Sequence, residues 1–363
     1  MWGMNLKTFF AVLLLGSLTG CSFKKNVLYL YNWADYIPQE ILERFEKETG
    51  ITVVCDAYES EEVAETNLYM SSNHDVVILT VWPSFARAVK SKLLSPIDYS
   101  LVPNAKGLDK KWTEKLEDID PENRYGVIYL FGSVGLGVNV KAVKESLGSI
   151  PRTWGLIFDP LYAKKLTEQR IYCLDTAKDV FQAALLYMGK DPCSQNFSDW
   201  TQAYELVRKV RPLIARFENG SQEANLLDEQ ACLIQAHSDV AMTAKERGQQ
   251  MNPKKNVNFV IPKEGVMMTG DVMTIPLRAQ HKQNAHIFIN FILRPENMAF
   301  ISNRLKSANA VKASLTFLDP ELLQDPNIFP NEQTMPLMKQ DFLPSLPLLR
   351  HIYELWLKLK QEG

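Results

Sequence analysis

A short turn near the start of the chain places two aromatic rings beside a carboxylate. Trp33, Asp35 and Tyr36 lie within four residues of one another, directly after an apolar run of strand character. The face of an aromatic ring attracts positive charge, and a carboxylate pairs with it. These residue types at this spacing therefore point to the binding of an organic cation.

The residues on either side of the turn predict the elements that position it. Val27 to Tyr31 is typical of a strand, and Pro38 suits the first position of a helix, where the missing N–H has no intrahelical partner to lose. Gly50 ends that helix, and a second strand begins at Ile51. In an open α/β sheet ligands bind at the carboxyl ends of the strands, which is where this turn lies.

The rest of the chain continues to alternate between strand and helix patterns. We predict strands over residues 75–79, 125–130, 135–140, 170–174, 257–261 and 272–275, with a glycine-rich bend at Gly132-Ser133. We predict helices over 83–90, from about 179, over 199–217, over 286–305 with an interruption at Pro295, and over 347–360. This alternation predicts parallel sheets covered by helices.

Three short sequence words carry a family resemblance. They are Tyr-Asn-Trp-x-Asp-Tyr at 31–36, Phe-x-Lys-Glu-Thr-Gly-Ile at 45–51 and Tyr-Glu-Ser at 58–60. In this order they resemble the start of the mature spermidine/putrescine-binding proteins, the extracytoplasmic receptors of polyamine ABC importers. The resemblance implies an α/β fold of the two-lobed periplasmic-binding-protein type (type II), in which each lobe is a mainly parallel sheet flanked by helices and the ligand cleft lies between the lobes.

The resemblance also implies lobe boundaries. The first lobe would hold residues 27–133 plus 270–305, and the second would hold 134–269 plus 306–363. The chain would cross between the lobes near Gly132–Gly135, near Gly270 and near Leu305–Asn309. Glycines at two of these crossings suit backbone hinges, although ordinary turns would use glycine too.

The same resemblance implies a set of ligand-binding residues in the first lobe. Trp33 and Tyr36 match rings that enclose the methylene chain, and Asp35 lies where the family has a glutamate that meets an amino group. Trp82 lies where a tyrosine is usual. Asp271, in Gly270-Asp271, matches an aspartate that binds an amine.

In the second lobe the matching motif is Asp175-Thr176-Ala177-Lys178-Asp179. Asp179 takes the role of a family glutamate, Thr176 replaces an aspartate that is a principal amine ligand, and Asp175 is a weaker candidate. Each candidate also has a structural interpretation. A tryptophan beside a strand often belongs to the core, Asp179 would suit the start of any helix, and Asp271 would suit a turn.

Several positions depart from the family pattern. His237 and Thr269 fall where the family has tryptophans, Ser307 falls near an expected tyrosine, and an expected late glutamine falls near Gln340 or Asp341. Two lost cation–ring contacts would weaken binding by roughly tenfold to several hundredfold. The altered cage leaves spermidine, putrescine and a different amine open, and a histidine at 237 could add a pH-sensitive group.

The N-terminus carries a secretion signal. Lys7 precedes a short apolar run that is too short to span a bilayer, and Leu18-Thr19-Gly20-Cys21 resembles a bacterial lipobox. We therefore expect residues 1–20 to be a lipoprotein signal peptide and Cys21 to be lipidated, which would anchor the protein in the periplasm. An ordinary signal peptide followed by a chance cysteine is the alternative.

Composition and motifs narrow the function further. Without residues 1–20 the chain loses only Lys7, which leaves 39 basic against 42 acidic residues, a balance that does not favour nucleic-acid binding. No metal helix, nucleophile elbow or phosphate loop is present, so we predict neither catalysis nor a cofactor or metal. Cys55, Cys173, Cys193 and Cys232 allow three full pairings; strand-like surroundings favour buried free thiols at Cys55 and Cys173.

The sequence therefore predicts a monomeric substrate-binding component of an ABC importer. It would bind a polyamine between its lobes, close around it, and deliver it to permease subunits in the inner membrane. A receptor of the same fold for another small solute, such as a thiamine-like cation or a metal, and a lipoprotein that only senses or interacts, are the alternatives.

Overall fold

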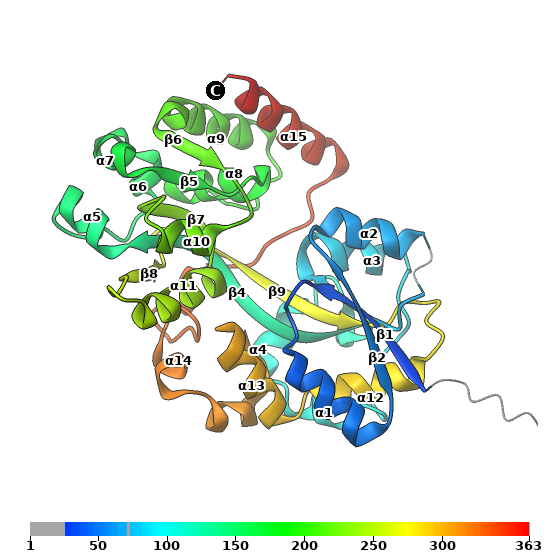
Figure 1. Cartoon of the computed structure of the whole chain (residues 1–363). Coiled ribbons are helices and arrows are strands. Elements are labelled where there is room, and N and C mark those ends of the chain that lie inside the picture. The colour runs from blue at the N-terminus through cyan, green and yellow to red at the C-terminus, as the bar shows by residue number, and fades with distance from the viewer. Residues whose placement is uncertain (1–25, 71–72, 363) are drawn as a thin grey trace, which may run out of the picture.

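Two α/β lobes are joined through two long strands, β4 (Gly126–Asn139) and β9 (Val266–Thr274) (Figure 1). This arrangement is seen in a computed structural model that describes residues 26–70 and 73–362. The expected signal peptide and Cys21 lie outside the described residues. Within the described ranges, no helix combines the length and the apolar character needed to cross a membrane.

The N-terminal part of the chain builds the first lobe. Its elements are β1 (Val27–Trp33), α1 (Gln39–Thr49), β2 (Thr52–Tyr58), α2 (Glu61–Tyr69), β3 (Val76–Thr80), α3 (Ala86–Lys90), α4 (Lys110–Thr113), and, after the return of the chain, α12 (Lys282–Ile292) and α13 (Pro295–Leu305). Leu28, Ile41 and Phe45 pack in its core, where the Phe45 ring meets Phe288 of α12 edge-on with centroids 5.1 Å apart.

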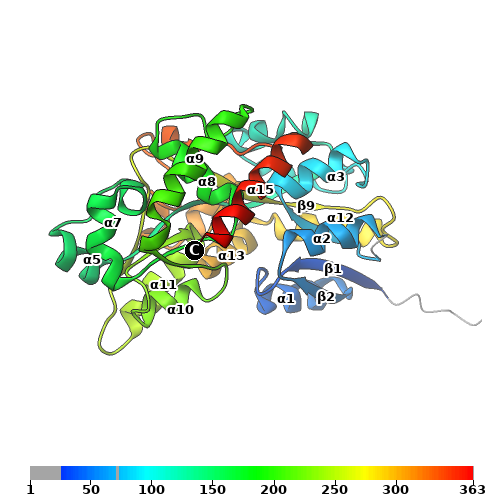
Figure 2. The same cartoon turned by 90° about the horizontal axis from the view of Figure 1, so that it is seen from above.

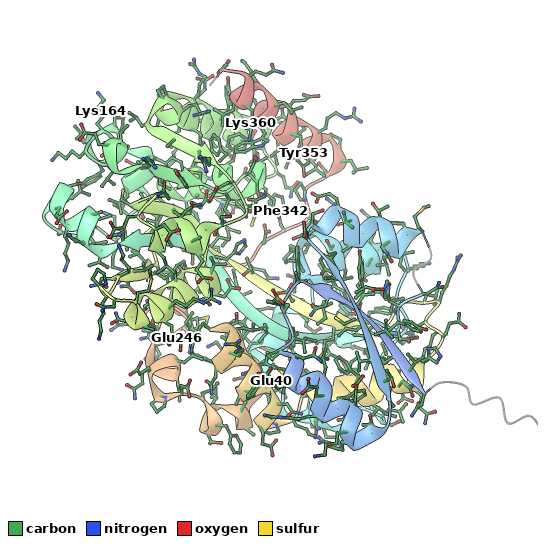
Figure 3. All side chains as sticks on the ribbon, viewed as in Figure 1. Glu40, Lys164, Glu246, Phe342, Tyr353 and Lys360 are labelled. Carbon is green, nitrogen blue, oxygen red and sulfur yellow. The ribbon has the colours of Figure 1, made fainter. Side chains whose placement is uncertain are left out.

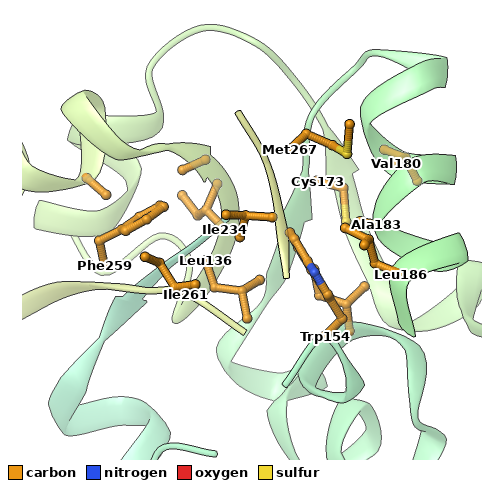
Figure 4. Close-up of a cluster of buried hydrophobic side chains, with 14 of the residues drawn as sticks. Leu136, Trp154, Cys173, Val180, Ala183, Leu186, Ile234, Phe259, Ile261 and Met267 are labelled. Atoms are coloured by element: carbon orange, nitrogen blue, oxygen red, sulfur yellow. The ribbon is translucent and has the colours of Figure 1, made fainter. Parts of the chain in front are cut away.

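The middle of the chain builds the second lobe. Its elements are α5 (Val140–Leu147), α6 (Gly155–Phe158), α7 (Pro160–Leu166), β5 (Ile171–Cys173), α8 (Ala177–Tyr187), α9 (Phe197–Val210), β6 (Ile214–Phe217), α10 (Gln222–Leu227), β7 (Leu233–His237), α11 (Ser238–Gln250) and β8 (Val257–Val260). Trp154, Val180, Ile234 and Phe259 from this part of the chain pack with Leu136 of β4 in an apolar core (Figure 4).

The C-terminal segment comprises β10 (Ala308–Asn309), α14 (Pro320–Gln324), β11 (Met338–Lys339) and α15 (Leu346–Gln361). Seen from above, α15 lies along α8 and α9 (Figure 2). Its Trp356 packs edge-on against Phe181 of α8 with ring centroids 5.8 Å apart, which attaches this last helix to the second lobe.

The strands form one continuous hydrogen-bonded sheet in the order β2-β1-β3-β9-β4-β7-β5-β6, with β8 and β10 paired to β4 and β11 paired to β9. The outer strands of each lobe are parallel, as predicted. However, β9 pairs antiparallel with β3, and β4 pairs antiparallel with β7, β8 and β9. The sheet of each lobe is therefore mixed rather than mainly parallel, because the two connecting strands run opposite to their neighbours.

Three local predictions need correction. Gly132 and Ser133 lie inside the unbroken strand β4 rather than in a bend; a Cβ on Gly132 would lie 2.7 Å from the Ser238 hydroxyl, so glycine allows the close approach. The helix predicted over 199–217 ends at Val210, just before Pro212. Cys55 is exposed, because its strand β2 lies at the edge of the sheet, whereas Cys173 is buried as expected.

The structure also settles two local points, of which the break at Pro295 and the free thiols of Cys55 and Cys173 were predicted and the state of Cys193 and Cys232 was left open. The interruption at Pro295 is present, because it separates α12 from α13. All four cysteines that follow Cys21 are free thiols.

Candidate functional site between the lobes

Asp271 lies at the centre of the candidate site. It is on β9, where it pairs in register with Thr80 at the end of β3, and it is only 9% exposed. The Tyr36 hydroxyl donates a hydrogen bond to Asp271 Oδ2 at 2.7 Å, and the Trp33 side chain also hydrogen-bonds to this carboxylate. The aromatic turn after β1 is therefore held directly against an acid that is 235 residues away from Tyr36 in the sequence.

Further aromatic side chains support this turn. The Trp33 ring packs on Tyr58 with centroids 4.5 Å apart, and the Tyr36 ring meets Tyr129 edge-on at 5.7 Å. The Tyr129 hydroxyl donates a hydrogen bond to the backbone carbonyl of Tyr36 at 2.9 Å. These contacts fix the rings that border the Asp271 carboxylate.

The second lobe brings charged side chains to the same place. Asp179 lies in the first turn of α8, where Thr176 hydrogen-bonds to its carboxylate. His237 ends β7, and Asp239 lies in the first turn of α11. The charges of Asp239 and His237 act on Asp271, and that of His237 acts on Asp179, so side chains of the two lobes lie near one another.

A second cluster of polar side chains, centred on Glu61, lies next to Asp271. Glu61, in the first turn of α2, accepts hydrogen bonds from Ser84 at 3.1 Å and from Thr80, the neighbour of Asp271. Across from it, Lys178 of α8 forms an ion pair with Asp341 and interacts electrostatically with Glu61. Phe342, the next residue after Asp341, lies where the lobes meet (Figure 3).

The carboxyl groups of this site carry perturbed pKa values. Burial raises the pKa of Asp271 to about 6, against the hydrogen bonds from Tyr36 and Trp33. Burial also raises the pKa of Glu61 to about 8, although Lys178 opposes the change. The pKa of Asp179 is raised by burial too. A raised pKa means that the surroundings do not fully stabilise the ionised carboxylate. A bound cation would stabilise it and so lower the pKa.

The structure brings most of the predicted residues together. Trp33, Tyr36 and Asp271 form one contact group, and Thr176, Asp179 and His237 face it from the second lobe; the ligand-binding role of each stays a prediction. Trp82, in the irregular helical turn Val81–Phe85, is half-buried, and within the described part of the chain its buried indole nitrogen has no hydrogen-bond partner.

Other candidates lie apart from this group. Asp35 is exposed at the tip of the turn, where its φ of 55° is left-handed, and among the described residues its side chain has no hydrogen bond or ion pair. Asp175 pairs with Lys360 of α15. Gln340 donates a hydrogen bond to the Lys115 carbonyl at 2.7 Å, and Ser307 is buried and bonds to the Leu305 carbonyl.

Sequence reasoning missed Glu61 and Asp239 as site residues. Both lie in the first turn of a helix that directly follows a strand, at the carboxyl edge of the sheet. A search for acids at that place would have found them. Lys178 belongs to the motif at 175–179, but its ion pair with Asp341 joins residues that are too far apart in the sequence for any local pattern to reveal.

Among residues 26–70 and 73–362 no group of three or more histidine, cysteine, aspartate or glutamate side chains could hold a metal ion. The arrangement instead offers buried carboxylates from two lobes around fixed aromatic rings. A two-lobed α/β molecule with such a site between its lobes is typical of solute-binding proteins.

Comparison with known proteins agrees with this class. Residues 40–330 match the family model described as bacterial extracellular solute-binding protein, and this chain belongs to that family. The putrescine-binding periplasmic protein SpuD of Pseudomonas aeruginosa is 34% identical over 98% of this chain and 98% of its own. The putrescine-binding periplasmic protein PotF of Escherichia coli is 34% identical over 85% of this chain and 84% of its own.

Solved structures show the same fold. A Listeria monocytogenes protein described as a spermidine/putrescine ABC transporter has a TM-score of 0.81 at 26% identity, covering 93% of this chain and 100% of its own. The substrate-binding protein PotD of Streptococcus pneumoniae has a TM-score of 0.81 at 22% identity, covering 93% and 99%. The predicted two-lobed type II periplasmic-binding-protein fold is therefore confirmed.

Proposed function

We propose that this protein is the extracytoplasmic substrate-binding component of an ABC importer and that it binds a polyamine between its lobes. The observation that carries the proposal is that Asp271, bordered by Trp33 and Tyr36, lies within electrostatic range of Asp239 and His237 of the other lobe, and that His237 also acts on Asp179. The relatives named above, which are putrescine-binding proteins, support the choice of ligand.

A polyamine matches the chemistry of this site. Its ammonium groups form charge-assisted hydrogen bonds with carboxylates, which are about twice as strong as neutral ones. Its methylene groups pack on flat rings such as Trp33. Because Asp271 is buried, its ionised form is costly without a partner, and an ammonium group would remove that cost.

The proposed mechanism is binding without chemistry, and it requires no cofactor. One lobe captures the amine, and closure brings the carboxylates of the other lobe onto the remaining ammonium groups. The lobes would be residues 27–133 plus 270–305 and residues 134–269 plus 306–363, with bending near the crossings in β4 and β9. The closed form would dock on an ABC permease in the inner membrane.

We also propose the cellular setting from the N-terminal sequence. Residues 1–20 would direct export, and Cys21 would then carry a lipid anchor, so that a monomeric receptor works in the periplasm beside its permease. The relatives described as periplasmic proteins support the extracytoplasmic part of this proposal.

A thermal-shift screen tests the function. The purified protein is heated with putrescine, spermidine, amino acids, thiamine or metal salts, and propylamine serves as the matched monoamine. A ligand at 100 times its Kd stabilises the folded state by about 2.7 kcal/mol, which gives a clear rise in Tm. We expect this rise with polyamines and not with propylamine. A rise only with another solute class, or with none, would overturn the proposal.

A further inference from the structure

A groove of about 580 Å³ opens on the second lobe beside α10 and α11. We call it the α10–α11 groove; its lining includes Gln222, Leu227 and Asp228 on one side and His237 and Val240 on the other. Figure 1 shows α10 and α11 as neighbours in the part of the second lobe where the connecting strands arrive.

His237 connects the groove with the proposed polyamine site. It lines the groove, and its charge also acts on both Asp179 and Asp271. From His237 the groove follows α11 through Val240 to Met251. At 1.5 Å per residue this part of the helix is about 20 Å long. The groove therefore leads away from the space between the lobes rather than forming an unrelated surface hollow.

The lining of the groove combines apolar walls, oxygen acceptors and one cation, Arg247, which pairs with Glu223. Leu227 and Val240 supply apolar surface. Gln222 is only 4% exposed, and within the described residues its buried Oε1 has no hydrogen-bond partner. Asp228 is exposed and has no ion pair among the described side chains, whereas Glu223 is already paired with Arg247 at 2.7 Å. Carbon walls with unpaired acceptors suit methylene groups that end in an ammonium.

We propose that the α10–α11 groove binds the outer aminoalkyl arm of a long polyamine whose other ammonium groups lie between the lobes. The arm passes His237, its methylene groups pack on Leu227 and Val240, and its terminal ammonium pairs with the exposed Asp228 carboxylate. This inference rests on the proposed polyamine function. It makes the protein selective for a linear tetraamine over a diamine.

Calorimetry with spermine and putrescine tests this selectivity. The wild-type protein is compared with Asp228→Asn, which removes the unpaired charge, and with Val240→Trp, which fills the groove. Glu229→Gln and Leu161→Trp are the matched controls, because Glu229 adjoins Asp228 but pairs with Lys255, and Leu161 is exposed on α7. Neither control residue lines the groove.

We expect wild-type protein to bind spermine more tightly than putrescine. Asp228→Asn should weaken spermine binding about two- to fivefold, as for an exposed ion pair, and leave putrescine binding unchanged. Val240→Trp should weaken spermine binding at least tenfold, again without an effect on putrescine. If both variants bind spermine as the controls do, the groove proposal is wrong even though putrescine binding persists. Failure of wild-type protein to bind any polyamine would instead refute the proposed function.

Discussion

Replacing Asp271 with asparagine should weaken polyamine binding and at the same time stabilise the empty protein. The substitution keeps an oxygen that can accept the Tyr36 hydrogen bond, and it removes the charge that an ammonium would pair with. A hydrogen bond to a charged group contributes about 1.5–3 kcal/mol. We therefore expect Asp271→Asn to weaken binding about ten- to hundredfold.

The stability effect has the opposite sign. The pKa of Asp271 rises from its ordinary value of 3.8 to about 6 in the folded protein, chiefly because of burial. A difference of about 2 in pKa corresponds to about 3 kcal/mol, which opposes folding once the carboxyl is ionised. Because the pKa is raised, the loss of folding free energy is absent below about pH 4, where the carboxyl is protonated in both states. It is complete above about pH 6, where the carboxyl is ionised in both states. Asp271→Asn should thus raise the free energy of unfolding by up to about 3 kcal/mol at pH 7 and leave it unchanged near pH 4.

Calorimetric titration with putrescine and urea unfolding at the two pH values measure both effects. Asp118→Asn, which changes an exposed aspartate, is the control and should alter neither quantity. A variant that binds weakly and also unfolds more easily at pH 7 would show that the substitution damages the fold. Unchanged affinity would remove Asp271 from the binding site.

Three further predictions concern the same site, and a fourth concerns the core of the second lobe. Polyamine affinity should fall between pH 7 and pH 5 in calorimetry, because Asp271, with a pKa of about 6, then takes up a proton; a flat profile would contradict this. Asp35→Asn should change affinity less than about twofold, since this exposed carboxylate has no contact with the site group, and a tenfold loss would show that the turn rearranges. Trp33→Ala should weaken binding by about 0.5–2 kcal/mol through loss of a ring contact, with Tm recorded to exclude unfolding. Trp200→Ala, which empties a fully buried position and removes the indole hydrogen bond to the Ser194 carbonyl, should lower the free energy of unfolding by about 3–5 kcal/mol in urea; a loss under 1 kcal/mol would mean that the core repacks.

Features that depend on local chemistry could be predicted from the sequence. The strand, aromatic turn and helix around Trp33 and Tyr36 follow from apolar patterning and from Pro38 and Gly50, whose αL backbone ends α1. The break at Pro295 follows from the missing proline N–H. Asp271 has no local signal that links it to Tyr36, and only the family resemblance placed the two together.

Features that depend on distant contacts could not be predicted in this way. The strand β4 continues through Gly132 because its backbone lies against Ser238, which is more than 100 residues later. The mixed sheet arises because β9 returns between β3 and β4, and strand patterns alone do not give direction. Asp35 is exposed and its backbone is left-handed, a conformation that the motif does not reveal.

The central claim is that acids from both lobes hold one polyamine against the Trp33 ring. A crystal structure of the protein grown with putrescine tests it most directly. We predict one ammonium within hydrogen-bonding distance of Asp271, the other near Asp179 or Asp239, and the methylene groups against Trp33. Putrescine bound elsewhere, or a site in which Asp271 still contacts only Tyr36 and Trp33 at saturating putrescine, would contradict the account.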